Sequence, residues 1–275
     1  MTLQSKTVLV TGSTDGVGRA VARGLALGGA NVLVHGRDAE RGRALIAEIE
    51  VNGGSASFLQ ADLASLAQVR QLADAVHART DRLNILINNA GIGSGPPGAE
   101  RQTSVDGYEL RFAVNFLSHF LLTALLLLLV KAAPKARIVN VASLGQHPLD
   151  FDDVMLERSY DGRRAYAQSK LAQITFTFDL AASLDPAAIT VNALHPATYM
   201  DTTMVRQGGI TPWSTVDEGA QAILNLALSP QLAGRSGLFF DGLREARPNA
   251  QAFDLQARKK LRSLSLRLAG LPGDF

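Results

Sequence analysis

The glycine-rich turn near the amino terminus constrains the fold more than any other stretch. The β-branched run Thr7–Val10 shows no alternation and predicts a strand buried on both faces. Glycines follow at positions 12, 16 and 18, directly before a segment with helical spacing. Glycine allows a tight turn and lets a phosphate approach free amides at a helix start. The turn therefore predicts a dinucleotide site; the alternative is an ordinary strand-to-helix turn.

The spacing within this turn narrows the class of site. It reads Gly-x-x-x-Gly-x-Gly, not the Gly-x-Gly-x-x-Gly of other dinucleotide folds, and it lacks the Gly-Lys-Ser/Thr of nucleoside triphosphate loops. The predicted cofactor contacts in the turn are Gly12, Ser13, Thr14, Gly16, Val17 and Gly18.

Predicted strands and helices alternate along the rest of the chain. Apolar runs predict strands at 31–35, 56–61, 85–91, 138–142 and 189–194, with an edge strand at 237–241. Helical spacing predicts helices at 19–27, 39–50, 66–78, 106–130, 163–184 and 218–228. This alternation indicates an α/β Rossmann fold, a doubly wound parallel sheet of about seven strands with helices on both faces. Without a linker or repeat, we expect one domain over residues 1–275.

Composition excludes several classes of function. Apolar residues make up 47% and charged residues 19% of the chain, as in soluble enzymes. The formal net charge is only +2, so charge gives no reason to expect nucleic acid as a partner. The chain has no cysteine, which excludes disulfides, thiolate metal sites and a cysteine nucleophile. We expect no metal.

Two segments raise the question of a membrane. Residues 120–130 are intensely apolar, but this run is shorter than the roughly 20 residues of a span, which favours a buried helix. The C-terminal helical tail, about residues 244–275, has an apolar and a basic face; packing on its own domain is favoured over lying on a membrane. Residues 1–6 lead into the first strand without a signal peptide, so we expect a cytoplasmic protein.

The end of the second predicted strand bears on the choice of cofactor. An acidic residue about 20 residues past the glycine turn would bind the adenosine ribose of NAD. Gly36 and Arg37 stand there instead, and an arginine can pair with a 2′-phosphate. Asp38 could accept from the ribose, but its position before a helix is more typical of an N-cap. We therefore expect NADP(H), with NAD(H) as the alternative.

Tyr166 and Lys170 lie four residues apart in a predicted helix and therefore share one face. A nearby ammonium favours the ionised phenol, so we expect the pKa of Tyr166 to fall below its reference of about 10. Such a tyrosine suits proton transfer at neutral pH. The same pair arises by chance in many helices, so it needs support from other residues.

Polar residues near the predicted strand ends give this support. Asn89 and Gly91 end the fourth strand and Ser143 follows the fifth, at the edge where open α/β sheets bind ligands. Asp62, after the third strand, either caps the next helix or accepts a hydrogen bond from an adenine amine. Asn115 stands among apolar residues and either satisfies a backbone group or serves the site.

Taken in order, these motifs resemble the short-chain dehydrogenase/reductase family over essentially the whole chain. They are Thr11-Gly12-x-x-x-Gly16-x-Gly18, Asn88-Asn89-Ala90-Gly91, Asn115, Ser143, Tyr166-x-x-x-Lys170 and Pro196. Residues 36–38, 115–120, 169–172 and 237–241 are similar to the retinol dehydrogenase-like and polyketide ketoreductase-like branch. The chain departs from many members in the wider spacing between Ser143 and Tyr166 and in Ala197 in place of glycine.

The resemblance implies a catalytic tetrad of Asn115, Ser143, Tyr166 and Lys170. Ser143 would hydrogen-bond the substrate oxygen and Tyr166 would exchange a proton with it. Lys170 would also bind the nicotinamide ribose, and Asn115 would position a water between Lys170 and solvent.

The resemblance also implies further cofactor contacts and a mode of pairing. Asp62 would lie at the adenine, and Asn89 would hold the central strand near the cofactor. The other expected contacts are Leu63, Ala90, Gly91, Pro196 and Thr198. Homo-oligomers would form through the helices that carry Asn115 and Tyr166.

Side chains predicted near the site favour a hydrophobic substrate. The expected lining residues are Tyr160, Tyr199, Met204 and Trp213, the last three on a mobile flap at 198–213, although each suits core packing equally. We therefore expect an NADP(H)-dependent oxidoreductase that interconverts a hydrophobic ketone or aldehyde and its alcohol. The alternatives are an epimerase or dehydratase with the same tyrosine–lysine pair, and a non-catalytic NADP(H)-sensing protein.

Overall fold

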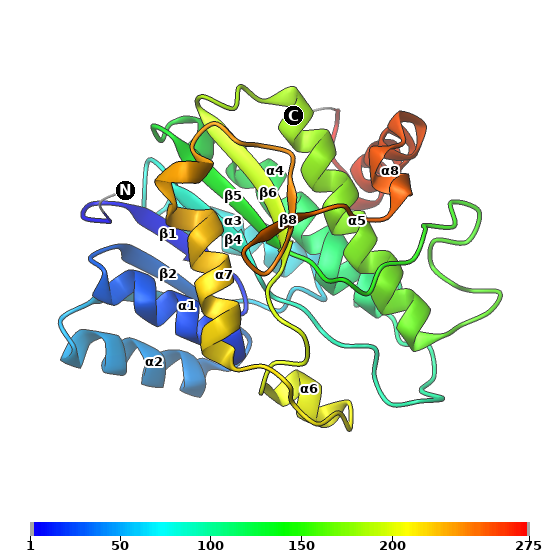
Figure 1. Ribbon diagram of the computed structural model, residues 1–275, viewed down its shortest axis with the longest axis horizontal. Coiled ribbons are helices and arrows are strands. Elements are labelled where there is room, and N and C mark those ends of the chain that lie inside the picture. The colour runs from blue at the N-terminus through cyan, green and yellow to red at the C-terminus, as the bar shows by residue number, and fades with distance from the viewer. Residues whose placement is uncertain (1–2, 274–275) are drawn as a thin grey trace.

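A single twisted sheet runs through the computed structural model, which describes residues 3–273 (Figure 1). The strands are β1 (Thr7–Val10), β2 (Asn31–Gly36), β3 (Ser55–Gln60), β4 (Ile85–Asn88), β5 (Ala136–Val141), β6 (Ile189–His195), β7 (Phe239–Asp241) and β8 (Arg244–Ala246). The described residues form eight strands in the order β3-β2-β1-β4-β5-β6-β7-β8. All neighbours pair in parallel except β7 and β8, which are antiparallel. The predicted doubly wound α/β fold is confirmed.

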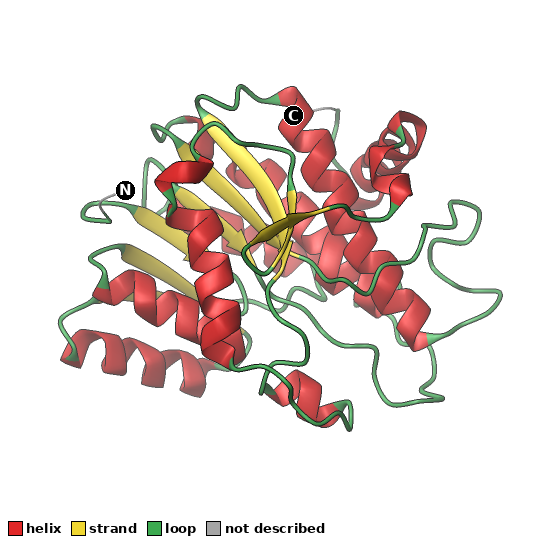
Figure 2. Cartoon of the chain, viewed as in Figure 1, coloured by secondary structure: helices red, strands yellow, loops and turns green. Residues whose placement is uncertain are grey.

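Helices cover both faces of this sheet (Figure 2). They are α1 (Gly16–Leu27), α2 (Ala39–Val51), α3 (Leu66–His77), α4 (Ser118–Lys131), α5 (Gly162–Ser183), α6 (Thr203–Gln207), α7 (Val216–Leu228) and α8 (Leu255–Ala269). Short 3₁₀ turns lie at η2 (Pro230–Leu232) and η3 (Ala250–Phe253). One apolar core joins the sheet to α1, α2 and α7, and the other joins it to α3, α4, α5 and α8. The central strands β1, β4, β5 and β6 are buried at every residue because both faces are covered.

Two elements differ from the sequence-based predictions. The predicted helix at 106–130 begins as a π-helix, η1 (Phe112–Leu117), and continues as α4. The combined segment of 20 residues is long and apolar enough to cross a membrane, yet 83% of its most apolar window is buried in the fold. This burial agrees with the prediction of a buried helix.

The second difference lies at the sheet edge. The predicted last strand is β7, but the chain then turns at Gly242, whose φ of +58° suits glycine, and adds β8 as the edge strand. Residues 244–246 therefore belong to the sheet, and the helical tail starts later, at η3 and α8.

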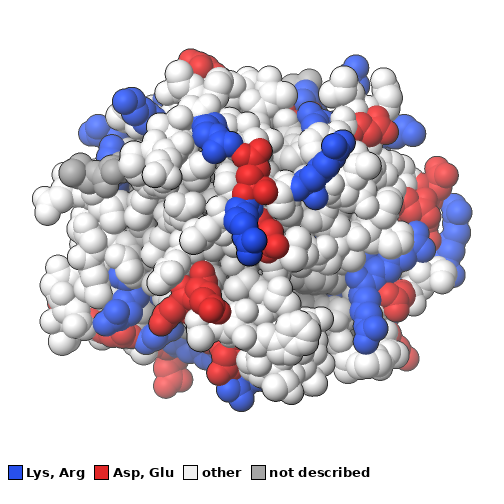
Figure 3. All heavy atoms as spheres, in the orientation of Figure 1, with Lys and Arg blue, Asp and Glu red and all other residues white. Residues whose placement is uncertain are grey.

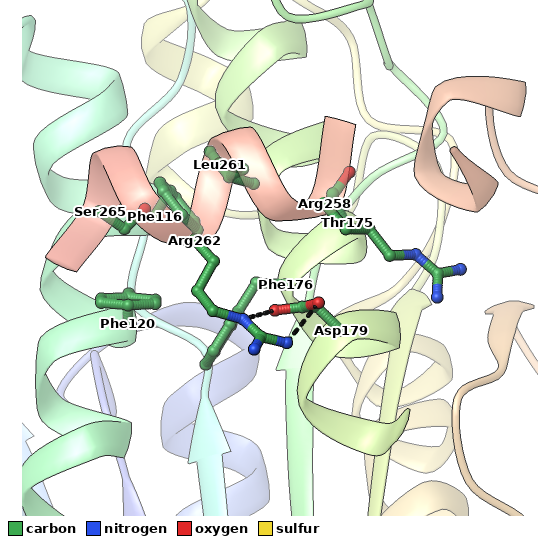
Figure 4. Close-up of a pocket in the computed structure, with 9 residues that line it drawn as sticks. All are labelled: Phe116, Phe120, Thr175, Phe176, Asp179, Arg258, Leu261, Arg262 and Ser265. Carbon is green, nitrogen blue, oxygen red and sulfur yellow. Dashed lines mark hydrogen bonds and ion pairs between the residues drawn. The ribbon is translucent and has the colours of Figure 1, made fainter. Parts of the chain in front are cut away.

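Helix α8 packs on its own domain, across α5 and η1 (Figure 4). Its buried face consists of Ala257, Leu261, Ser265 and Ala269. Arg262 holds the Asp179 carboxylate of α5 with two hydrogen bonds of 2.7 Å. Between these helices remains a narrow pocket lined by Phe116, Phe120, Thr175, Phe176, Asp179, Arg258, Leu261, Arg262 and Ser265.

Charged side chains are interspersed on the face shown in Figure 3, where basic and acidic residues lie close together. Exposed ion pairs in the structure include that of Arg235 with Glu245 at the β7–β8 edge. This mixed distribution agrees with the formal net charge of +2.

Candidate active site

The glycine-rich turn lies at the carboxyl edge of β1, packed against the residues that follow β4. Gly12 and Gly16 have φ of +63° and +53°, which L side chains rarely adopt. A Cβ at Gly12 would lie 2.7 Å from the Ala90 Cα, and one at Gly18 would lie 2.3 Å from the Asn89 Nδ2. Gly12 and Gly18 are therefore required by the close contact between the turn and residues 89–90, and Gly16 by its positive φ.

Hydrogen bonds join the turn to the segment after β4. The Asn89 side-chain amide donates to the carbonyl oxygens of Thr11 (2.9 Å) and Gly12 (3.1 Å). In return, the Thr11 hydroxyl oxygen accepts from the backbone N–H groups of Asn89 (2.9 Å) and Ala90 (3.0 Å). These four hydrogen bonds fix the glycine-rich turn against the segment after β4 at the carboxyl edge of the sheet.

Free backbone donors lie at the start of α1. The Gly16 N–H is bound by the Asp15 carboxylate, which caps the helix, and the first helical bond runs from the Arg19 N–H to the Asp15 carbonyl. Among the described residues, no acceptor is seen for the amides of Val17 and Gly18. Two open donors at the positive end of a helix suit a phosphate, so the residues present fit a dinucleotide here.

The residues expected to determine the preference between NADP(H) and NAD(H) lie at the end of β2. The Asp38 carboxylate accepts from the backbone N–H groups of Glu40 (2.9 Å) and Arg41 (3.0 Å), so its interpretation as an N-cap is confirmed. The exposed Arg37 donates no side-chain hydrogen bond to another described residue. A Cβ at Gly36 would lie 2.6 Å from the Thr14 side chain, so glycine brings β2 against the turn.

Asp62 lies beyond β3 but is not the cap of α3. The cap is Ser65, whose hydroxyl accepts from the Gln68 N–H, while Asp62 accepts from the Ala64 N–H at 3.0 Å. Capping by Asp62 was thus a wrong alternative. Its neighbour Leu63 is buried in the core.

Ser143 and Tyr166 meet beside Gly145. A Cβ at Gly145 would lie 3.5 Å from the Ser143 Oγ and 3.7 Å from the Tyr166 Cε1. Burial raises the pKa of Tyr166; the hydrogen bond with the Ser143 side chain lowers it, and the nearby Tyr199 phenol raises it. The net result is a raised pKa, so the expected depression of the Tyr166 pKa is wrong for the chain by itself.

Lys170 explains why this expectation fails. Its Nζ lies 5.8 Å from the Tyr166 ring centroid and donates to the Val141 carbonyl and to the Gln173 Oε1, both at 2.9 Å. Its side chain is only 5% exposed, and burial lowers its pKa from 10.5 to about 7. Lys170 is therefore a weaker source of positive charge at neutral pH than an exposed lysine.

Asn115 lies in the π-helix, and its side chain, like that of Lys170, lies close to Gly91. A Cβ at Gly91 would lie 3.3 Å from the Asn115 Oδ1 and 3.4 Å from the Lys170 Nζ. Asn115 donates to the Ile92 carbonyl (3.1 Å) and the Ser169 Oγ (2.9 Å), and it accepts from the Ile92 N–H (2.8 Å). It does satisfy backbone groups, and it also touches the helix that carries Tyr166 and Lys170.

Three of the four predicted lining residues lie on the flap. Tyr199 and Trp213 stack edge to face with ring centroids 5.3 Å apart, and Tyr199 has a φ of +46°, rare for a non-glycine residue. Met204 lies on α6 and would contact a Cβ at Gly93. All three side chains are exposed. The flap also donates a hydrogen bond of 2.8 Å from Thr203 to Asp15, which places it over the glycine-rich turn.

Tyr160, the fourth predicted lining residue, has its hydroxyl held by hydrogen bonds to two charged side chains. Its hydroxyl accepts from the Arg111 guanidinium at 2.8 Å and donates to the Glu109 carboxylate at 3.4 Å. Burial of the phenol raises the pKa of Tyr160. Arg111 and Glu109 are both buried, so this cluster fixes the loops around the site.

After β6, Pro196 is buried and Thr198 is partly buried. The Thr198 Oγ1 lies 3.1 Å from the Nε2 of His195. The chain thus leaves β6 in a defined direction toward the flap.

Sequence reasoning missed several polar residues that organise the site. They are His35, Glu109, Arg111 and His119, all buried. For His119 a signal was present, because it follows Asn115 by four residues and therefore shares its helical face. The others gave no periodic or motif signal of their own.

Comparisons with known proteins agree with this geometry. The sequence matches the short chain dehydrogenase family over residues 6–211, and the chain therefore belongs to the short-chain dehydrogenase/reductase family. Within that family it is retinol dehydrogenase-like. Human retinol dehydrogenase 13 is 38% identical over 293 residues, which cover 98% of this chain and 86% of that protein. Members of the family are NAD(P)(H)-dependent oxidoreductases that interconvert alcohols and carbonyl compounds by hydride transfer.

Solved structures of other proteins share this fold over most of the chain. A protein from Mycobacterium paratuberculosis superposes with a TM-score of 0.79 at 29% identity, covering 99% of this chain and 97% of that one. RhlG from Pseudomonas aeruginosa, solved as an NADP active-site complex, superposes with a TM-score of 0.71 at 28% identity and covers 87% of this chain and 95% of its own.

Proposed function

We propose that this enzyme uses NADP(H) to interconvert a hydrophobic ketone or aldehyde and its alcohol, with Tyr166 as general acid and base. The observation that carries the proposal is the meeting of Ser143, Tyr166 and Lys170 at the sheet edge beside the glycine-rich turn. A hydroxyl, a phenol and an ammonium in this arrangement suit proton transfer to an oxygen that gains negative charge.

The chain's own groups divide the work around the reacting carbonyl. Bound cofactor would supply the hydride. Ser143 would hydrogen-bond the substrate oxygen, and Tyr166, whose raised pKa keeps it protonated at neutral pH, would donate its proton to that oxygen. Lys170 would then return a proton toward Tyr166 because its pKa of about 7 lets it exchange protons near neutrality.

Asn115 would hold the water that connects Lys170 to solvent. Both N–H groups of its side chain are already engaged, so it can receive a water only through its oxygen atoms. The Asn115 Oδ1 and the Lys170 Nζ both lie close to Gly91, so a water bound to an Asn115 oxygen there would be near the Lys170 ammonium.

The preference for NADP(H) rests on the end of β2. The Asp38 carboxylate is occupied as a helix cap, and the exposed Arg37 beside it can reach a 2′-phosphate. The amides of Val17 and Gly18 would receive the pyrophosphate, and Asp62 would lie toward the adenine. RhlG, which shares this fold, carries NADP in its solved complex.

The preference for a hydrophobic substrate rests on the flap. Tyr199, Met204 and Trp213 present exposed apolar surface, and Tyr199 lies close enough to Tyr166 to affect its pKa. The name of the human relative refers to retinol, an apolar alcohol. Of the predicted lining residues, Tyr160 would act mainly through its contacts with Arg111 and Glu109.

We also propose that the enzyme is cytoplasmic and forms a homo-oligomer. Helix α8 packs against η1 and α5, so pairing through the helices that carry Asn115 and Tyr166 would use the surface of α4 and α5 that α8 leaves uncovered. Light scattering after size exclusion and flotation with liposomes at physiological salt test these two points; a monomer or a floating fraction would contradict them.

The test of the activity is NADPH oxidation with a panel of hydrophobic ketones and aldehydes, alongside Tyr166→Phe. We expect turnover in the wild type that falls by about 10³-fold or more in the variant, with NADPH affinity changed less than about twofold. An epimerase or dehydratase would convert substrate without net NADPH consumption, and a sensor would bind NADPH and convert nothing. Either outcome would overturn the proposal.

A further inference from the structure

The buried imidazole of His119 connects two parts of the site that are far apart in sequence. It lies in the first turn of α4, with its Nδ1 3.1 Å from the Asn115 carbonyl oxygen and its Nε2 3.0 Å from the Thr11 Oγ1. A carbonyl oxygen can only accept, so Nδ1 carries the hydrogen and Nε2 is left as an acceptor. The Thr11 hydroxyl then donates to Nε2, which is the shorter of its two acceptor contacts; the Ile87 carbonyl oxygen lies farther away, at 3.4 Å.

This assignment completes the hydrogen bonds of Thr11. With its proton given to His119, the Thr11 oxygen accepts from the backbone N–H groups of Asn89 and Ala90. A continuous chain of hydrogen bonds therefore runs from the Asn115 carbonyl, through His119 and Thr11, to the segment that packs against the glycine-rich turn.

The charge state of His119 keeps this chain intact. Burial lowers the pKa of His119 to about 3, the bond to Asn115 raises it, and Lys170 and His35 lower it. The ring is therefore neutral across the range in which the enzyme can be assayed. Protonation of Nε2 would remove the acceptor that Thr11 needs.

His35 provides an internal contrast. It is also buried and neutral, but its Nδ1 accepts from the Gly12 N–H at 3.1 Å and its Nε2 donates to the Ala61 carbonyl at 3.2 Å. The structure thus requires opposite tautomers in the two histidines. His35 ties the turn to the end of β3, whereas His119 ties it to the π-helix.

We propose that His119 is a positioning residue that fixes the Asn115 carbonyl relative to Thr11, at the start of the glycine-rich turn. Its two ring nitrogens have separate effects: Nδ1 orients Asn115 and through it the proton path from Lys170, and Nε2 orients Thr11 and through it the cofactor segment. This inference rests on the proposed function for its kinetic part only. A histidine that merely fills the core would affect stability without separating these two effects.

Two substitutions separate the nitrogens. His119→Asn keeps a donor near the position of Nδ1 and loses the acceptor for Thr11. His119→Gln places its amide oxygen near the position of Nε2 and loses the donor to Asn115. We expect His119→Asn to raise the NADPH dissociation constant about tenfold with kcat changed less than about threefold, and His119→Gln to lower kcat about tenfold with the dissociation constant changed less than about twofold.

The experiment has one kinetic arm and two arms that need no substrate. Fluorescence titration measures NADPH binding, and nitrogen-detected NMR of the histidine rings reports the tautomers of His119 and His35 in the wild type. His77→Gln, an exposed histidine on α3, serves as the matched control and should change neither constant. Thr11→Val removes the hydroxyl while leaving His119 in place, and it should weaken NADPH binding at least as much as His119→Asn.

The outcomes are decisive. An Nδ1–H tautomer at His119 with the expected separation supports the proposal. An Nε2–H tautomer, or variants that lose kcat and NADPH affinity in the same proportion, would overturn it. If no substrate is found, the activity proposal fails, while the tautomers and the difference in NADPH affinity between the two variants still test His119. If the His119 variants do not fold, Thr11→Val with unchanged NADPH affinity would overturn it.

Discussion

Replacing Lys170 by methionine should remove a pH-dependent cost to stability. Below pH 7 the lysine is charged in both the folded and the unfolded chain, so the folded protein carries the full cost of burying that charge. Between pH 7 and pH 10.5 the folded chain has released the proton and the unfolded chain has not. The unfolded state then binds more protons, so the free energy of unfolding of the wild type rises with pH across this window.

The size of the effect follows from the two pKa values. The difference 10.5 − 7 is 3.5, and at about 1.4 kcal/mol per pH unit this gives about 5 kcal/mol over the whole window. About 2 kcal/mol of this falls between pH 7 and pH 9. Methionine also leaves the Val141 carbonyl and the Gln173 Oε1 without their donor, but this loss does not vary with pH.

Urea unfolding of the cofactor-free protein at pH 6, 7, 8 and 9 measures this effect. Between pH 7 and pH 9, the free energy of unfolding of the wild type should rise by about 2 kcal/mol more than that of Lys170→Met. This holds whichever of the two proteins is more stable at pH 7. Lys259→Met, at an exposed position on α8, controls for loss of a lysine and should follow the wild type at every pH. Parallel curves for the wild type and Lys170→Met would refute the reasoning, since Lys170 would then bind its proton equally well in both states.

Three further substitutions test other parts of the site. Arg37→Ala should weaken NADPH binding about ten- to hundredfold and leave NADH binding unchanged; an unchanged ratio of the two dissociation constants, measured by titration, would remove the assignment of Arg37 to the 2′-phosphate. Gly18→Ala places a Cβ 2.3 Å from the Asn89 Nδ2 and should lower the free energy of unfolding by about 1–3 kcal/mol in urea, whereas an unchanged value would show that the turn can relax. Glu109→Gln leaves the Arg111 guanidinium, only 5% exposed, without its charge partner and should cost about 3 kcal/mol, part of which the double variant with Arg111→Met should restore.

The doubly wound fold could be predicted because its strands are covered on both faces. Such strands read as unbroken apolar runs, and glycines mark the turns between them. The antiparallel β8 could not be read in this way, because Arg244–Ala246 is short and carries charged residues on a solvent-exposed edge. Its formation depends on the turn at Gly242, which the sequence pattern does not distinguish from a loop.

The site was predictable in position but not in electrostatics. Sequence order places Ser143 at the ligand-binding edge, because parallel strands end on the same side, and the family resemblance adds Tyr166 and Lys170 to it. The pKa of Tyr166 could not be predicted, since it depends on how deeply the phenol is buried and on where the Lys170 ammonium points. The four-residue spacing predicts that Tyr166 and Lys170 share a helix face, but it determines neither the burial of the phenol nor the direction of the ammonium.

The π-helix at Phe112–Leu117 was missed for a similar reason. Its residues are apolar and suit an α-helix equally well, and the widened turn is stabilised by contacts far away in sequence. The Asn115 side chain hydrogen-bonds Ile92 and Ser169, which are 23 and 54 residues away in the sequence.

The position of α8 has a consequence for how the chain is made. Helix α8 is synthesised after every element that it covers, so on the ribosome the rings of Phe116, Phe120 and Phe176 have no cover while the sheet behind them can already form. During that interval the nascent chain presents an aromatic surface to chaperones and to other nascent chains. The bidentate contact between Arg262 and Asp179 then forms late and attaches α8 to α5. Its loss should lower the yield of soluble protein more than the stability of the folded protein.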